Sequence, residues 1–295
     1  MEQGLPPNGC CNLGSLDLSK FYKNDGFSFE LFEEAIRLGV NFLDHVIDIN
    51  QYPNEDIKQW AEDNRPVGLG IMGLADLFLS NKIAYGSKES LDYIDTIMSF
   101  MKEIAENESE KMGAELGIPE ACKYLPTPRR NITTMTIAPT GTVSLLAGCF
   151  GSGCEPVFSE LTTRKDKTGT YQIIHPDSEK EYFRCAVSSN GLKEVNWKEH
   201  VFVQAQLQKY IDSGVSKTIN FPSGTHKETI GDAFILAWKL GIKGITVYRN
   251  GSRSVEVLSP KNMKKDRCPV CGEDLVRESG CKHCIECDFS LCDIG

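Results

Sequence analysis

Residues 225–248 read THKETIGDAFILAWKLGIKGITVY, and this stretch decides the fold class. Thr225 and Glu228 form a capping-box pattern ahead of an apolar run with helical spacing. Gly241 is placed to end that helix, and residues 242–248 have the composition of a strand. The stretch therefore predicts a helix that leads directly into a strand.

The rest of the chain extends this pattern. Residues 133–138, TTMTIA, predict a short buried strand. Residues 29–50 predict an amphipathic helix capped by Ser28, and 88–106 and 197–211 predict two more helices. Strands and helices in this order favour an α/β architecture.

Composition and charge narrow the class of protein. With 295 residues, of which 40% are hydrophobic, the chain can bury a large core. Its net charge of −9 disfavours a nucleic-acid partner. We find neither a membrane-spanning run nor a signal-peptide pattern at the start, so we expect a cytoplasmic protein without a membrane partner.

The C-terminal cysteines predict a metal site. Cys268 and Cys271 form one C-x-x-C pair and Cys284 and Cys287 form another, twelve residues later. Four thiolates in this spacing can surround one tetrahedral zinc ion, and metal binding would supply the folding free energy that so small a module lacks. We therefore predict that these four cysteines bind zinc.

The same cysteines predict a domain boundary. Residues 259–267 are polar and basic, which is typical of a linker. We expect a main domain at 1–258, the linker at 259–267 and a zinc ribbon at 268–295.

Two further cysteines, Cys281 and Cys292, flank the predicted ligands. Such a pair favours a mobile dithiol that passes electrons, whereas a zinc ribbon without one is usually a binding module. Because Cys281 also forms a C-x-x-C pair with Cys284, the division between ligands and redox thiols stays open.

Residues 68–73, GLGIMG, match the dinucleotide-binding pattern G-x-G-x-x-G. The preceding AEDNRPV is too polar to be the buried strand which that fold requires, so a nicotinamide dehydrogenase has weak support. A tight helix entry with close backbone packing explains these glycines better.

Six segments together resemble the large chains of ribonucleotide reductases, and particularly the class II, adenosylcobalamin-dependent form. In chain order they are LPPNGCCNLGSLDL (5–18), NRPVGLGIMGLADL (64–77), APTGTVSLLAGCFGSGCEPVF (138–158), GVSKTINFP (214–222), AWKLGIKGITVYRNGSR (237–253) and the six-cysteine tail (268–292). The resemblance implies the C-terminal part of a ten-stranded α/β barrel of the radical-enzyme type, followed by a small zinc ribbon. It implies reduction of ribonucleoside diphosphates or triphosphates to deoxyribonucleotides.

The resemblance also implies catalytic roles. The family's finger-loop motif is Asn-Pro-Cys-Gly-Glu, and Glu2 falls on its glutamate, which acts on the substrate's 3′ hydroxyl, while Met1 falls on the glycine. Cys11 matches one cysteine of the reducing pair, and Cys10 is a bystander. Cys281 and Cys292 would reduce that pair again. The radical cysteine has no counterpart, so we expect an N-terminal partner chain to supply it.

The run after the predicted strand at 133–138 corresponds to the family's substrate phosphate loop. Its residues are Pro139, Thr140, Gly141, Thr142 and Ser144. Backbone N–H groups and hydroxyls there would bind the phosphate at a helix N-terminus. Without the resemblance, PTGT indicates a turn with a helix cap.

The resemblance further implies cofactors and partners. Class I chains carry two adjacent tyrosines where this chain has Val247 and Tyr248, which favours a radical made with adenosylcobalamin, held mostly by the partner chain. Zinc and a thioredoxin or glutaredoxin type reductant complete the expected set. The main alternative is an inactive remnant that acts as a zinc-ribbon binding protein.

Overall fold

The structure is a computed structural model that describes residues 2–23, 26–166, 169–188 and 191–252, and in the C-terminal part 270–271, 275–278, 281–284, 287 and 289–292. The chain divides into two compact units. The larger comprises Met1–Glu160 and Ile174–Val257, and the smaller comprises Leu161–Ile173 and Leu258–Gly295. The predicted linker at 259–267 lies outside the described residues.

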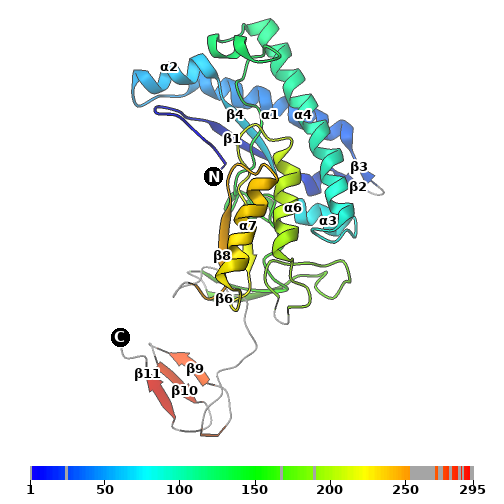
Figure 1. The fold of residues 1–295 in the computed structure, drawn as a ribbon, viewed down its shortest axis with the longest axis vertical. Helices are drawn as coiled ribbons and strands as arrows, with labels where there is room; N and C mark the ends of the chain where they lie inside the picture. The colour runs from blue at the N-terminus through cyan, green and yellow to red at the C-terminus, as the bar shows by residue number, and fades with distance from the viewer. Residues whose placement is uncertain are drawn as a thin grey trace. The chain divides into compact units, whose positions relative to one another are not determined.

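Parallel pairs and bridges link five extended segments of the larger unit in chain order, and Figure 1 labels β1, β4 and β8 among them. β1 (Asn12–Asp17) pairs in parallel with β4 (Val67–Met72) from Asn12↔Val67 to Asp17↔Met72. The strand predicted at 133–138 takes the third place, because Met135 bridges Leu69 in parallel.

The other side of this segment continues the same order. Ile137 bridges Val215 in parallel, and the chain then enters β7 (Thr218–Phe221). β7 pairs in parallel with β8 (Thr246–Arg249). Among the described residues, β1 and β8 each have a strand neighbour on one side only, so the parallel arrangement is open at both edges.

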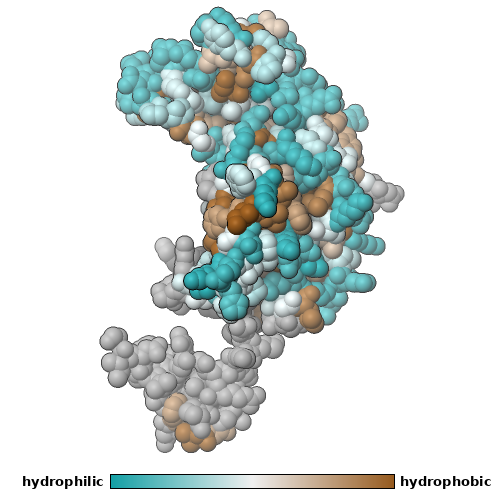
Figure 2. All heavy atoms as spheres, viewed as in Figure 1, coloured by the Kyte–Doolittle hydropathy of each residue, from teal (hydrophilic) through white to brown (hydrophobic). Residues whose placement is uncertain are grey.

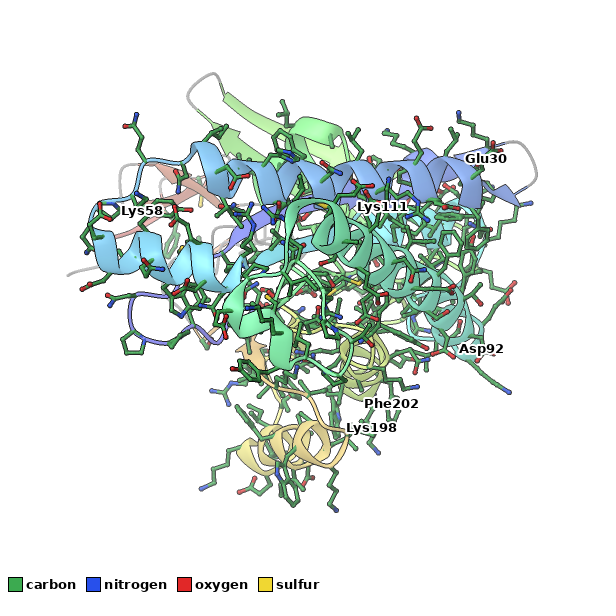
Figure 3. The ribbon with its side chains drawn as sticks, turned by 90° about the horizontal axis from the view of Figure 1, so that it is seen from above. Glu30, Lys58, Asp92, Lys111, Lys198 and Phe202 are labelled. Atoms are coloured by element: carbon green, nitrogen blue, oxygen red, sulfur yellow. The ribbon has the colours of Figure 1, made fainter. Side chains whose placement is uncertain are left out.

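One long helix packs directly on this sheet, and a second long helix packs on the first. α1 (Phe29–Ile49) packs on β1, β4 and α4 (Lys88–Leu116). In Figure 3, Glu30 marks the N-terminal end of α1 and Lys111 marks α4. The side chains of α1 that enter the core lie three and four residues apart, as the apolar pattern predicted: Phe32, Ile36, Val40, Leu43 and Ile47.

The remaining elements are short. The helices are η1 (Leu18–Phe21), α2 (Glu55–Asn64), α3 (Leu74–Ser80), η2 (Glu120–Tyr124), α5 (Val143–Ala147), α6 (Trp197–Gln208) and α7 (Lys227–Lys239). The strands are β2 (Tyr22–Lys23), β3 (Gly26–Phe27), β5 (Leu161–Asp166), β6 (Gly169–Ile174), β9 (Leu275–Glu278), β10 (Cys281–Cys284) and β11 (Ser290–Cys292).

Most predicted helices are confirmed, with changes at their ends. Ser28 caps α1 through its hydroxyl, and α4 runs ten residues further than predicted because its apolar pattern continues to Met112. The capping box at Thr225 is wrong. α7 begins one residue later than that pattern requires, with His226 as N-cap and no side-chain capping bond.

The GLGIMG segment is a buried strand. β4 itself contains Gly68 and Gly70, and a Cβ atom at Gly70 would lie 2.1 Å from the carbonyl oxygen of Thr136. The two glycines therefore let β4 and the third segment approach closely. Only Gly73, at φ +67° before α3, serves the predicted helix entry. Close packing and the helix entry therefore account for these three glycines without a bound dinucleotide.

The surface of the larger unit carries an apolar face. Figure 2 shows hydrophobic side chains gathered over α6 and α7, where Phe234, Ile235 and Trp238 are exposed. These three side chains recur at helical spacing on the face of α7 opposite Ala233 and Ala237, which are buried. No helix among the described residues has the length and apolarity that a membrane crossing requires.

Candidate active site

The phosphate loop, which we define as Pro139–Ser144, follows the third extended segment. Its main support is a second loop, Phe150–Glu155, which we call the brace loop. The amide of Gly153 donates to Oγ1 of Thr140 at 2.6 Å, and Oγ of Ser144 donates to Oγ of Ser152 at 3.2 Å. The two loops are therefore joined by one backbone-to-side-chain bond and one bond between side chains.

The brace loop is fixed by α3 as well. Both carboxylate oxygens of Asp76 accept hydrogen bonds of 2.9 Å, from the amides of Phe150 and Gly151. Gly153 has φ +51°, and a Cβ atom there would lie 2.7 Å from the carbonyl oxygen of Ala138. Only glycine fits this close approach.

The predicted substrate-binding residues divide into two groups. Thr140 and Ser144 are buried, and their hydroxyls take part in the bonds to the brace loop. Pro139, Gly141 and Thr142 are exposed. Within the described part of the chain, the amides of Gly141 and Thr142 donate no hydrogen bond, so they are available to an anion.

Glu2 lies against the third and fourth segments of the sheet. Its carbonyl oxygen accepts from the amide of Gly214 at 2.7 Å and from Oγ1 of Thr136 at 2.9 Å. Next to it, Oε1 of Gln3 accepts from Oγ of Ser213 at 3.1 Å. The start of the chain is thereby anchored three residues before the phosphate loop, at the level of Thr136.

Cys11 lies at the opposite end of the sheet, immediately before β1. It is half-buried beside Cys10, Tyr52 and Pro66. Burial, with a smaller contribution from Cys10, raises the pKa of the Cys11 thiol from 9.0 to about 12. The thiol is therefore protonated at neutral pH and can donate a hydrogen atom or proton.

The described C-terminal cysteines lie on or beside a three-stranded antiparallel sheet in the order β11-β10-β9. Its register places Cys281 directly opposite Cys292. Cys271 lies in the turn before β9, and Cys284 ends β10, three residues before Cys287. Cys268 lies outside the described residues, and the described side chains contain no group of three metal-binding residues, so the zinc site stays a prediction.

Comparisons with known proteins identify the family. The family model described as "Ribonucleotide reductase, barrel domain" matches residues 1–128 and 122–248. The chain belongs to the ribonucleotide reductase family. The predicted resemblance to the C-terminal part of a class II reductase is thereby confirmed, because the relatives below are vitamin B12-dependent.

The chain is similar to several curated reductases over part of their length. It is 37% identical to a vitamin B12-dependent ribonucleoside-diphosphate reductase of Thermoplasma acidophilum, over 88% of this chain and 38% of that one. A relative of the same name from Mycobacterium tuberculosis is 32% identical over 88% of this chain and 42% of its own. This chain therefore spans about two fifths of the length of these reductases.

A solved structure supports the fold. The class Id ribonucleotide reductase alpha subunit of Actinobacillus ureae superimposes with a TM-score of 0.67 at 24% identity, over 82% of this chain and 50% of that one. The predicted α/β barrel class is thus confirmed for the reductase chain.

The described residues form a cavity beside the brace loop that is too small for adenosylcobalamin. This cavity of about 310 Å³ lies between α3 and the segment around His175, lined by Ser19, Lys20, Asp76, Phe150 and His175 among others. A corrin ring with its nucleotide and adenosyl groups is far larger than this cavity. This cavity therefore does not fit the cofactor.

Sequence reasoning missed the residues that support the phosphate loop, namely Asp76, Ser152, Gly153 and Glu155. Part of the signal was present: the motif that carried the resemblance runs on to Phe158 and contains the spaced glycines Gly151 and Gly153, although it does not indicate which loop they support. Such a pair indicates a tight turn with close backbone approach.

Proposed function

We propose that this chain reduces ribonucleotides to deoxyribonucleotides by thiyl-radical chemistry, together with an N-terminal partner chain. The observation that carries the proposal is the position of Glu2 at Thr136, on the segment that leads into the phosphate loop. Three residues of extended chain span about 10 Å. One ribose with its 5′-phosphate can bridge that distance, with the 3′ hydroxyl near Glu2.

The phosphate loop would bind the substrate through its exposed part. The amides of Gly141 and Thr142 bind the phosphate oxygens, and Pro139 borders the site. The hydroxyls of Thr140 and Ser144, which were predicted as direct contacts, also hold the loop in shape, because both are bonded to the brace loop. The binding energy then comes from amides fixed in advance, which lowers the entropic cost of binding.

The reducing chemistry would use Cys11 and Glu2. A radical cysteine of the partner chain removes the 3′ hydrogen, and Glu2 accepts the proton of the 3′ hydroxyl while water leaves from C2′. Cys11 and a second cysteine in the partner chain supply two electrons and two protons and end as a disulfide. The raised pKa of Cys11 keeps the thiol in the protonated form that this step requires. The balance is one ribonucleotide and two thiols to one deoxyribonucleotide, water and one disulfide.

The tail would restore that disulfide to thiols. Cys281 and Cys292 lie opposite each other on neighbouring antiparallel strands, where Cα atoms are typically about 4.5–5.5 Å apart, within the range for a disulfide. We propose that this dithiol exchanges with the active-site disulfide and is reduced by a thioredoxin or glutaredoxin type protein. Cys268, Cys271, Cys284 and Cys287 would hold a structural zinc ion that stabilises this sheet.

The partner chain would complete the barrel. The five parallel segments described here are open at β1 and β8, and a second set of five would close them into the ten-stranded form. The exposed apolar face of α7 offers a surface for such a partner. Adenosylcobalamin would be held by the partner chain.

The proposal is tested by complementation. The chain is assayed for deoxyribonucleotide formation with adenosylcobalamin and dithiothreitol, alone and with an N-terminal reductase chain from the same genome. Activity only in the mixture is expected. Absence of activity in every mixture, together with intact zinc binding, would contradict the proposal and favour the zinc-ribbon binding protein.

A further inference from the structure

A buried ion pair lies behind the brace loop. Nζ of Lys217 lies 2.6 Å from Oε2 of Glu155, and the Lys217 side chain is fully buried. The other carboxylate oxygen of Glu155 accepts from the amide of Thr218, the first residue of β7, at 2.5 Å. Glu155 thus ties the end of the brace loop to the start of β7 by two bonds.

Among the described residues, Glu155 is the one carboxylate that pairs with Lys217. Nζ lies 5.5 Å from the centre of the Tyr85 ring, and the Tyr85 hydroxyl donates to the carbonyl oxygen of Cys154 at 2.5 Å. His200, next to Tyr85, adds no second positive charge beside Lys217, because burial and then Lys217 lower its pKa well below the usual value. A buried ammonium without its carboxylate is costly, so the pair is held together.

The ion pair is connected to the phosphate loop by short steps. Glu155 lies two residues after Gly153, whose amide bonds Thr140. On the other side, Ser216, which precedes Lys217, donates its amide to the carbonyl oxygen of Ile137, two residues before Pro139. The pair therefore joins the two pieces of chain that flank the phosphate loop.

We infer that Glu155 and Lys217 are positioning residues that set the conformation of the phosphate loop and thereby its affinity for the nucleotide's phosphates. The inference rests on the proposed function, since it takes Pro139–Ser144 as the phosphate site. Neither residue touches the substrate. Their effect passes through the bond from Gly153 to Thr140 and through the segment that joins Lys217 to β7.

The test uses inorganic pyrophosphate as the probe and the amide signals of Gly141 and Thr142 in the full chain as the readout. In a two-dimensional NMR titration of the wild-type chain, these signals are expected to shift with pyrophosphate. Lys217→Met and Glu155→Gln are each expected to weaken the fitted affinity about tenfold. The double variant removes both charges, so its thermal stability is expected to exceed that of Glu155→Gln while its affinity stays low.

Glu108→Gln is the matched control. Glu108 is 4% exposed and pairs with Arg37 at 3.0 Å between α4 and α1, without a hydrogen bond to either loop among the described residues. It is expected to lose stability and keep wild-type affinity. Wild-type affinity in Lys217→Met and in the double variant would overturn the inference and leave the loop assignment intact. Unshifted Gly141 and Thr142 signals in the wild-type chain would overturn both.

Discussion

The two ends of the parallel sheet are built differently. At the phosphate-loop end, bonds from α3, the brace loop and β7 fix the backbone, and the amides of Gly141 and Thr142 have no partner among the described residues. At the other end, Cys10 and Cys11 are adjacent thiols whose pKa values are raised by burial. One end offers a fixed set of donors for an anion, whereas the other keeps thiols protonated.

The largest expected effect comes from the thiol end. Cys11→Ser is expected to lower turnover of the complemented enzyme by about 10³-fold or more, because a hydroxyl cannot be oxidised to a disulfide. Nucleotide affinity is expected to stay unchanged, since the phosphate loop lies at the other end. Deoxyribonucleotide formation and equilibrium binding measure the two effects. Cys10→Ser is the control, and an equal loss of turnover there would contradict the assignment of Cys11.

The phosphate-loop end is tested by glycine substitution. Gly153→Ala is expected to destabilise the fold by about 2 kcal/mol or more, because φ is +51° and the new Cβ would meet the carbonyl oxygen of Ala138. Gly141→Ala is the matched control, since a Cβ there has no atom within 4 Å. We expect a change within about 0.5 kcal/mol for it. Urea unfolding measures both, and equal losses would contradict the close approach of the two loops.

A smaller effect is expected in how folding stability and the reactivity of Cys11 depend on pH. Because the pKa of Cys11 is raised to about 12 in the folded chain, its contribution to stability is complete below about pH 9 and is lost as pH rises from 9 toward 12. Iodoacetamide is accordingly expected to alkylate Cys11 at pH 9 at least about tenfold more slowly in the folded than in the urea-unfolded chain. Mass spectrometry of the Cys11 peptide gives both rates. Equal rates would mean that the thiol is not shielded.

Zinc removal is expected to have the smallest effect on the stability of the larger unit. Chelation is expected to remove one zinc per chain and to abolish turnover with a thioredoxin type reductant, while dithiothreitol still supports it. The thermal unfolding of the larger unit is expected to change by less than about 0.5 kcal/mol, because the predicted ligands all lie in the tail. Loss of turnover with both reductants would show that the larger unit itself needs the metal.

Sequence patterns predicted the α/β class, α1 and the extended segment at 133–138, because these depend on local apolar spacing. They did not predict that Gly68 and Gly70 lie in a buried strand, since a strand with two glycines has weak β propensity and is stabilised by its neighbours. Nor did they predict the brace loop. Its bond to Thr140 joins residues 13 positions apart in the sequence, and its bond to Ser144 joins residues 8 positions apart. Which loop supports another depends on tertiary contacts that no local pattern encodes.

The central claim is that Cys11 reduces a substrate held at the phosphate loop. The most direct measurement is a single turnover of the prereduced, complemented enzyme without external reductant, followed by quantification of Cys11 in its oxidised and alkylated forms. The account predicts one oxidised Cys11 for each deoxyribonucleotide formed, in a disulfide with a cysteine of the partner chain. Product formed while Cys11 remains fully alkylatable would contradict it.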